Sequence, residues 1–153
     1  MIVKEIRDED FTSYKKPSMV IGFPRCNWKC GKGLCQNSPL ATSPDIEINI
    51  NKLIERYIGD PITHAIICAG LEPFDSWEDL QCFITNFRYW SNDDVVIYTG
   101  YYKNEVQDKI EWLKLYAPIV VKFGRYQQGQ RPHYDPILGV MLASDNQWAE
   151  RIS

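Results

Sequence analysis

The stretch PSMVIGFPRCNWKCGKGLCQN, residues 17–37, joins an apolar segment directly to a loop rich in cysteine. Its first part, residues 17–24, is a short and largely apolar run of the kind that forms a buried β-strand. Its second part contains three of the five cysteines of the chain, Cys26, Cys30 and Cys35. This order predicts a strand whose carboxyl end runs into a loop that presents three thiols.

Three further apolar segments repeat the strand pattern, and helical patterns lie between them. The later predicted strands are THAIICAG, DVVIYTG and PIVVKFG, at residues 63–70, 94–100 and 118–124. The predicted helices lie at residues 50–58, 76–87 and 105–116. Continuous apolar strands separated by helices of about a dozen residues pair in parallel through βαβ units. We therefore predict a single α/β domain over residues 1–153, with a mostly parallel sheet.

Local signals predict the ends of two helices. Gly59 follows a run of apolar residues at helical spacing and is expected to end the first helix. Ser76, with Asp79 three residues later, is expected to act as the N-cap of the second. Residues 125–153 are polar and contain glycine, with one more apolar stretch at residues 137–142.

The four predicted strands all end in unusual sequence. The first runs into the cysteine loop, and the others run into AGLEPF, TGYY and FGRY. In parallel sheets ligands bind at the carboxyl ends of the strands, which meet at one edge. We therefore expect these four segments to form one ligand-binding rim.

Composition excludes several classes of protein. The net charge of −3 argues against a nucleic-acid-binding module, which usually has a basic surface. The charged N-terminus lacks the apolar core of a signal peptide, and no apolar run is long enough to span a membrane. We expect a cytoplasmic protein with reduced thiols, so clustered cysteines favour metal or redox chemistry over disulfides.

The spacing of the thiols favours an iron–sulfur cluster over structural zinc. A structural zinc site needs four ligands. Beyond the loop the next candidates are His64 and Cys68, about thirty residues further on in a predicted buried strand. We interpret Cys68 and Cys82 as packing residues. Three thiolates on a four-iron cluster would leave one iron open to another ligand. A zinc-stabilised binding module remains the non-enzymatic alternative.

The ordered motifs resemble a known family. FPRCNWKCGKGLCQN after a strand is similar to the cluster loop of radical S-adenosylmethionine (SAM) enzymes, and most similar to that of the small activating proteins of anaerobic ribonucleotide reductases. GLEP at residues 70–73 resembles the methionine-binding stretch of the family. IYTGYY, VVKFGRY and SDNQ, at residues 97–102, 120–126 and 144–147, resemble later motifs of this subgroup.

The sequence departs from the family pattern at two points. The cysteine spacing is Cys-x3-Cys-x4-Cys, where the family usually has Cys-x3-Cys-x2-Cys. The two additional residues include a glycine, which allows the loop to bulge while keeping its third ligand. Leu71 stands where the family has a glycine, which is compatible with contacts made by backbone groups.

The resemblance implies a fold, two cofactors and a set of site residues. The fold would be an abridged partial (β/α) barrel of the radical SAM type, in one domain. A [4Fe-4S] cluster would be bound by Cys26, Cys30 and Cys35. S-adenosyl-L-methionine would be bound by Gly70, Leu71, Glu72, Thr99, Gly100 and Asn146.

The resemblance also implies a reaction and a partner. Reductive cleavage of SAM would yield a 5′-deoxyadenosyl radical that removes hydrogen from a C-terminal glycine of the large anaerobic ribonucleoside-triphosphate reductase subunit. A flavodoxin- or ferredoxin-like protein would supply the electron. The alternatives within the family are an activating enzyme for another glycyl-radical protein and a radical enzyme acting on a small molecule.

Overall fold

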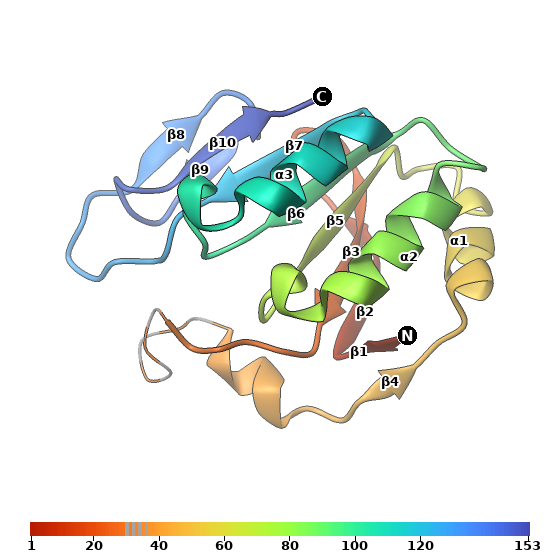
Figure 1. Cartoon of the computed structure of the whole chain (residues 1–153), viewed down its shortest axis with the longest axis horizontal. Helices are drawn as coiled ribbons and strands as arrows, with labels where there is room; N and C mark the ends of the chain where they lie inside the picture. The colour runs from red at the N-terminus through yellow and green to blue at the C-terminus, as the bar shows by residue number, and fades with distance from the viewer. Residues whose placement is uncertain (30, 32, 34, 36) are drawn as a thin grey trace.

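The computed structural model describes residues 1–29, 31, 33, 35 and 37–153, so Cys30 lies outside the described residues. The protein is a mixed α/β structure around a six-stranded sheet with the order β10-β7-β6-β5-β3-β2 (Figure 1). Its four central strands pair in parallel, which confirms the predicted strands and their direction. They are β3 (Ser18–Phe23), β5 (Ala65–Gly70), β6 (Asp94–Tyr98) and β7 (Ile119–Phe123).

Both edges of the sheet are antiparallel strands that the sequence pattern did not reveal. They are β2 (Glu5–Asp10), which pairs with β3, and β10 (Trp148–Arg151), which pairs with β7. The sequence of β2 is EIRDED, so it lacks the apolar run by which the central strands were recognised. Charged residues are typical of exposed sheet edges, where they discourage pairing with other chains.

Two small antiparallel pairs complete the strands. One joins β1 (Ile2–Val3) to β4 (Ile46–Glu47), and the other joins β8 (His133–Asp135) to β9 (Val140–Leu142). The predicted apolar stretch at residues 137–142 therefore contributes a strand only in its second half.

The described residues form three α-helices: α1 (Ile50–Ile58), α2 (Trp77–Phe87) and α3 (Gln107–Leu113). Short 3-10 turns accompany them: η1 (Ser38–Thr42), η2 (Pro73–Ser76), η3 (Lys103–Glu105) and η4 (Lys114–Tyr116). The helix α1 ends before Gly59 as predicted. The helix predicted for residues 105–116 begins only at Gln107, because Val106 has a non-helical backbone conformation after η3, and its last residues form the 3-10 turn η4.

The prediction that Ser76 caps α2 is correct in position but wrong in the hydrogen bond that it implies. Ser76 occupies the N-cap position of α2, but its side chain makes no capping hydrogen bond. The turn η2 runs directly into α2, so Ser76 has a backbone conformation of φ −114° and ψ 48° instead of an extended one. Its hydroxyl group is buried without a hydrogen-bond partner among the described residues.

The two faces of the sheet are covered differently. All three α-helices pack on one face, against strand residues such as Met19, Ile66 and Ile97 (Figure 1). The other face presents the alternate residues, including Val20 and Val96, to a helix-free cluster. That cluster contains Tyr14, Leu138 and Leu142.

The two cysteines outside the loop have different environments. Cys68 lies in the core on the helical side, and burial raises the pKa of its thiol. It therefore packs as predicted. Cys82 is exposed on α2, so its interpretation as a packing residue is wrong. Among the described residues, no helix has the length and apolar character needed to cross a bilayer.

Candidate functional site

A cavity of about 280 Å³ lies at the carboxyl ends of β5, β6 and β7. Strand residues of its wall include Ala69, Tyr98 and Lys122, which share the helix-free face of the sheet with Val96 and Val120. The loop after each of these strands adds further residues to the wall. The expectation of one shared rim at this edge is therefore confirmed for the described segments.

Most of the residues singled out in the sequence meet at this cavity. Its lining includes Cys26, Cys35, Gly70, Leu71, Glu72, Thr99 and Gly100. The predicted ligand Cys30 lies outside the described residues. Asn146 is not part of the lining, because its side-chain amide donates to the Tyr102 hydroxyl at 2.9 Å and to the Arg125 carbonyl at 2.6 Å. The adjacent residue Gln147 lines the cavity instead.

Glu72 is a buried carboxyl group held by neutral donors. Its Oε1 accepts hydrogen bonds from the Phe74 amide at 3.1 Å and from the Thr99 hydroxyl at 2.9 Å. Its Oε2 accepts one from the Gly100 amide at 2.9 Å. Burial outweighs these bonds and raises the pKa of Glu72 to about 7. A carboxyl group in this state is well suited to receive a cationic group of a ligand.

Backbone hydrogen bonds attach the start of the cysteine loop to the segment that contains Glu72. The Leu71 amide donates to the Phe23 carbonyl at 3.1 Å, and the Glu72 amide donates to the Arg25 carbonyl at 2.7 Å. The Asn37 side chain closes the other end of the loop by donating to the Gly70 carbonyl at 3.0 Å. The first and last cysteines of the loop are thereby kept beside Glu72.

Gly70 is required by the neighbouring strand. Its φ is +93°, and a Cβ atom at this position would lie 2.5 Å from the backbone nitrogen of Phe23 and 2.7 Å from two backbone atoms of Gly22. Strands β5 and β3 therefore approach each other closely at this glycine. Gly100 differs, since a Cβ there would make only ordinary contacts.

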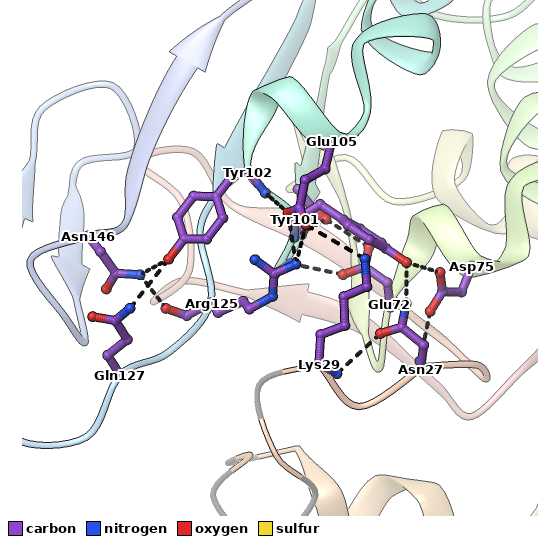
Figure 2. Close-up of polar contacts among 12 residues, drawn as sticks. Asn27, Lys29, Glu72, Asp75, Tyr101, Tyr102, Glu105, Arg125, Gln127 and Asn146 are labelled. Carbon is purple, nitrogen blue, oxygen red and sulfur yellow. Dashed lines mark hydrogen bonds and ion pairs between the residues drawn. The ribbon is translucent and has the colours of Figure 1, made fainter.

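A polar network beside the cavity joins three loops (Figure 2). Tyr101 donates from its hydroxyl to Asp75 at 2.7 Å and accepts from the side chain of Asn27. The Lys29 ammonium lies 4.7 Å from the centroid of the Tyr101 ring. Asn27 and Asp75 were not recognised in the sequence, although each stands directly beside a motif that was: Cys26 precedes Asn27, and GLEPF precedes Asp75.

Basic side chains also line the cavity. Lys122 is buried on β7 and donates to the Gly124 carbonyl at 2.9 Å. Arg125 binds Glu105 through contacts of 2.6 and 2.8 Å, and Lys29 lies 3.6 Å from the same carboxylate. Lys122 was not recognised as a site residue in the sequence, because it is embedded in an apolar strand. The wall of the cavity therefore combines thiols, cations and one carboxyl group.

Comparison with known proteins finds no matching family model, no matching curated protein and no matching solved structure. Within the described residues, no group of three or more His, Cys, Asp and Glu side chains is arranged to hold a metal ion. This search does not extend to Cys30.

The described residues fit both groups that the sequence resemblance implies. Cys26 and Cys35 are partly exposed thiols on the wall of the same cavity, as two ligands of one cluster must be. Glu72, buried in that wall with neutral donors, supplies a partner for an amino acid ammonium group. The donor set of the cavity thus matches an iron–sulfur cluster beside a methionine-containing ligand.

Proposed function

We propose that this protein is a radical SAM activating protein for a glycyl-radical enzyme. The observation that carries the proposal is the shared cavity, where Cys26 and Cys35 meet Glu72, Thr99 and Gly100. These residues come from three loops separated by long stretches of sequence. Their convergence supports one common site for the cluster and for SAM.

We extend the proposal to the fold, as an abridged partial (β/α) barrel of the radical SAM type. The consecutive order of β3, β5, β6 and β7 supports it, and so does the packing of all three α-helices on one face. The cavity adjoins the other face, which corresponds to the inside of such a barrel.

Cys26, Cys30 and Cys35 would hold a [4Fe-4S] cluster, and Glu72 would receive the ammonium group of S-adenosylmethionine. When bound, the reduced cluster supplies the electron that splits SAM into methionine and a 5′-deoxyadenosyl radical. Thr99 and the Gly100 amide orient the carboxyl group of Glu72 for this contact. Glu72 and Thr99 are buried, which shields this side of the cavity from water.

The substrate that we propose is a C-terminal glycine of the large anaerobic ribonucleoside-triphosphate reductase subunit. The 5′-deoxyadenosyl radical would take one hydrogen atom from this glycine, giving 5′-deoxyadenosine and a glycyl radical. A flavodoxin- or ferredoxin-like protein would return the single electron used in each event. This assignment of partner and reductant is supported by the sequence resemblance alone.

Iron and sulfide analysis tests the cluster. After anaerobic reconstitution we expect about four irons and four sulfides per chain. Replacing Cys26, Cys30 or Cys35 by Ala should greatly lower the iron content. Cys82→Ala is the matched control, because Cys82 is an exposed thiol away from the cavity. Stoichiometric zinc without sulfide would contradict the proposal and favour a metal-stabilised binding module.

Product analysis and electron paramagnetic resonance test the reaction. The reduced protein should convert SAM into methionine and 5′-deoxyadenosine. Mixing it with the reductase subunit, SAM and a reductant without oxygen should produce a glycyl radical signal. Replacing the acceptor glycine of that subunit by alanine should abolish the signal. SAM cleavage without any radical on this partner would leave the chemistry in place and overturn the proposed substrate.

A further inference from the structure

A closed ring of three hydrogen bonds connects the cysteine loop to two other segments. The Asn27 side chain donates to the Tyr101 hydroxyl, and that hydroxyl donates to Asp75 Oδ1 at 2.7 Å. The backbone amide of Asn27 donates to Asp75 Oδ2 at 2.9 Å, which closes the ring (Figure 2). Every donor in the ring has an acceptor, so the three groups support one another.

The ring bears directly on Cys26, because Asn27 is the next residue in the chain. The amide of Trp28 also donates to the Cys26 sulfur at 3.3 Å, so the backbone on this side of the thiol is defined by local contacts. Lys29, two residues beyond Asn27, lies over the ring of the same tyrosine. Tyr101 therefore contacts the loop at two points that follow its first cysteine.

Tyr101 also supports the carboxyl group of Glu72. Its backbone amide donates to the Thr99 hydroxyl at 3.0 Å, and that hydroxyl donates to Glu72 at 2.9 Å. The same residue is thus bonded to the thiol-bearing loop by its side chain and to the support of Glu72 by its backbone.

We propose that Tyr101 is a positioning residue, whose hydroxyl acts with Asp75 to hold Asn27 and thereby fixes the thiol of Cys26 at the cavity wall. The inference rests on the proposed function, since fixing this thiol matters chemically when it is a cluster ligand. Burial and the neighbouring Asp75 raise the pKa of Tyr101, so its hydroxyl remains a proton donor at neutral pH.

Two matched variants, Tyr101→Phe and Tyr102→Phe, isolate the effect of the Tyr101 hydroxyl group. Tyr101→Phe removes two of the three hydrogen bonds of the ring while keeping the aromatic side chain that packs beside the core. Tyr102→Phe removes the neighbouring hydroxyl, which binds Asn146 and lies on the side away from Asn27. Asn27→Ala breaks the ring at an exposed position, and it serves if Tyr101→Phe does not fold.

The first measurement is amide hydrogen exchange of residues 25–29 in the metal-free protein. In Tyr101→Phe or Asn27→Ala we expect exchange in this segment to become about fivefold faster, corresponding to the loss of about one net hydrogen bond. Tyr102→Phe should exchange like the unmodified protein. Unchanged exchange in the first two variants would overturn the inference, whether or not the protein binds iron.

The second measurement separates a positioning role from a structural one. In reconstituted protein with equal iron content, Tyr101→Phe should change the electron paramagnetic resonance spectrum of the reduced cluster, and Tyr102→Phe should not. Faster exchange with an unchanged spectrum would show that Tyr101 orders the loop without positioning the thiol, which also overturns the inference. Absence of iron from the unmodified protein would instead defeat the proposed function, and with it the role assigned to the thiol.

Discussion

Two buried carboxyl groups stand at opposite edges of the same pair of strands. Glu72 follows β5 at the carboxyl edge, and Asp94 begins β6 at the amino edge. Their exposures are nearly equal, at 4% and 3%. Their pKa values nevertheless shift in opposite directions, since that of Glu72 is raised to about 7 and that of Asp94 is lowered.

The difference lies in the partners of the two groups. Asp94 has Lys16 at 2.6 Å and Arg151 at 3.2 Å, and it accepts a hydrogen bond from Tyr14 at 3.0 Å. Glu72 has neutral donors, and among the described residues no cation lies within salt-bridge distance of it. The protein thus neutralises the carboxylate at the amino edge with its own cations. Under the proposed function, the carboxyl group of Glu72 would instead pair with the ammonium group of SAM.

The largest expected effect comes from changing the carboxyl edge itself. Gly70→Ala should lower the free energy of unfolding by about 3 kcal/mol or more, because the new Cβ meets the β3 backbone and φ is +93°. Gly100→Ala is the matched control and should change stability by less than about 1 kcal/mol. Urea denaturation measures both variants. Equal stabilities would contradict the tight approach of β5 to β3.

The pH dependence of stability tests the Glu72 side of the comparison. Its folded-state pKa of about 7 lies above the ordinary value of 4.5, so the folded protein holds a proton on this group between these two pH values. The contribution of Glu72 to the free energy of unfolding is therefore present below pH 4.5 and falls by about 3 kcal/mol as pH rises to 7.

Comparison of the unmodified protein with Glu72→Gln isolates this contribution. The difference between their unfolding free energies should decline over the same interval and then level off above it. A difference that does not vary with pH would show that the pKa of Glu72 is the same in the folded and unfolded protein, which would contradict its raised value.

The opposite sign is expected for Asp94. Asp94→Asn should cost about 2 kcal/mol near neutral pH, because it leaves two cations and a tyrosine without their shared carboxylate. The lowered pKa means that this contribution is present above 3.8 and is lost as pH falls. Asp8→Asn is the control, since its pair with Arg56 is about half exposed and worth about 0.5 kcal/mol. Denaturation at pH 7 and pH 3 measures both variants.

The smallest expected effect concerns Tyr102, at the far side of the polar network. Tyr102→Phe removes a hydroxyl that accepts from Asn146 at 2.9 Å, and water can reach the partly exposed groups that this leaves. The loss should be below about 1 kcal/mol in thermal unfolding. The stacking of the ring near Trp148 is kept. A larger loss would show that the rigid part of the carboxyl edge includes the turn that contains Asn146.

Much of the fold and part of the site could be predicted from the sequence. The apolar runs that became β3, β5, β6 and β7 are buried on both faces, so they carry a signal that needs no knowledge of neighbours. Edge strands such as β2 have no such signal. The meeting of the cysteine loop with GLEP and TGYY followed from parallel pairing, which places successive strand ends at one edge.

The central strands, their direction and the edge at which Cys26, Cys35 and Glu72 meet could therefore be read from residue patterns. Tertiary structure alone decided which neighbours these residues have. Asn27 and Tyr101 are 74 residues apart, and Asp75 and Asn27 are 48 apart, so no local pattern could pair them. The tertiary structure also decided that the pKa values of Glu72 and Asp94 shift in opposite directions. The pKa of a buried carboxyl group depends on desolvation and on nearby cations, and both are properties of the folded chain.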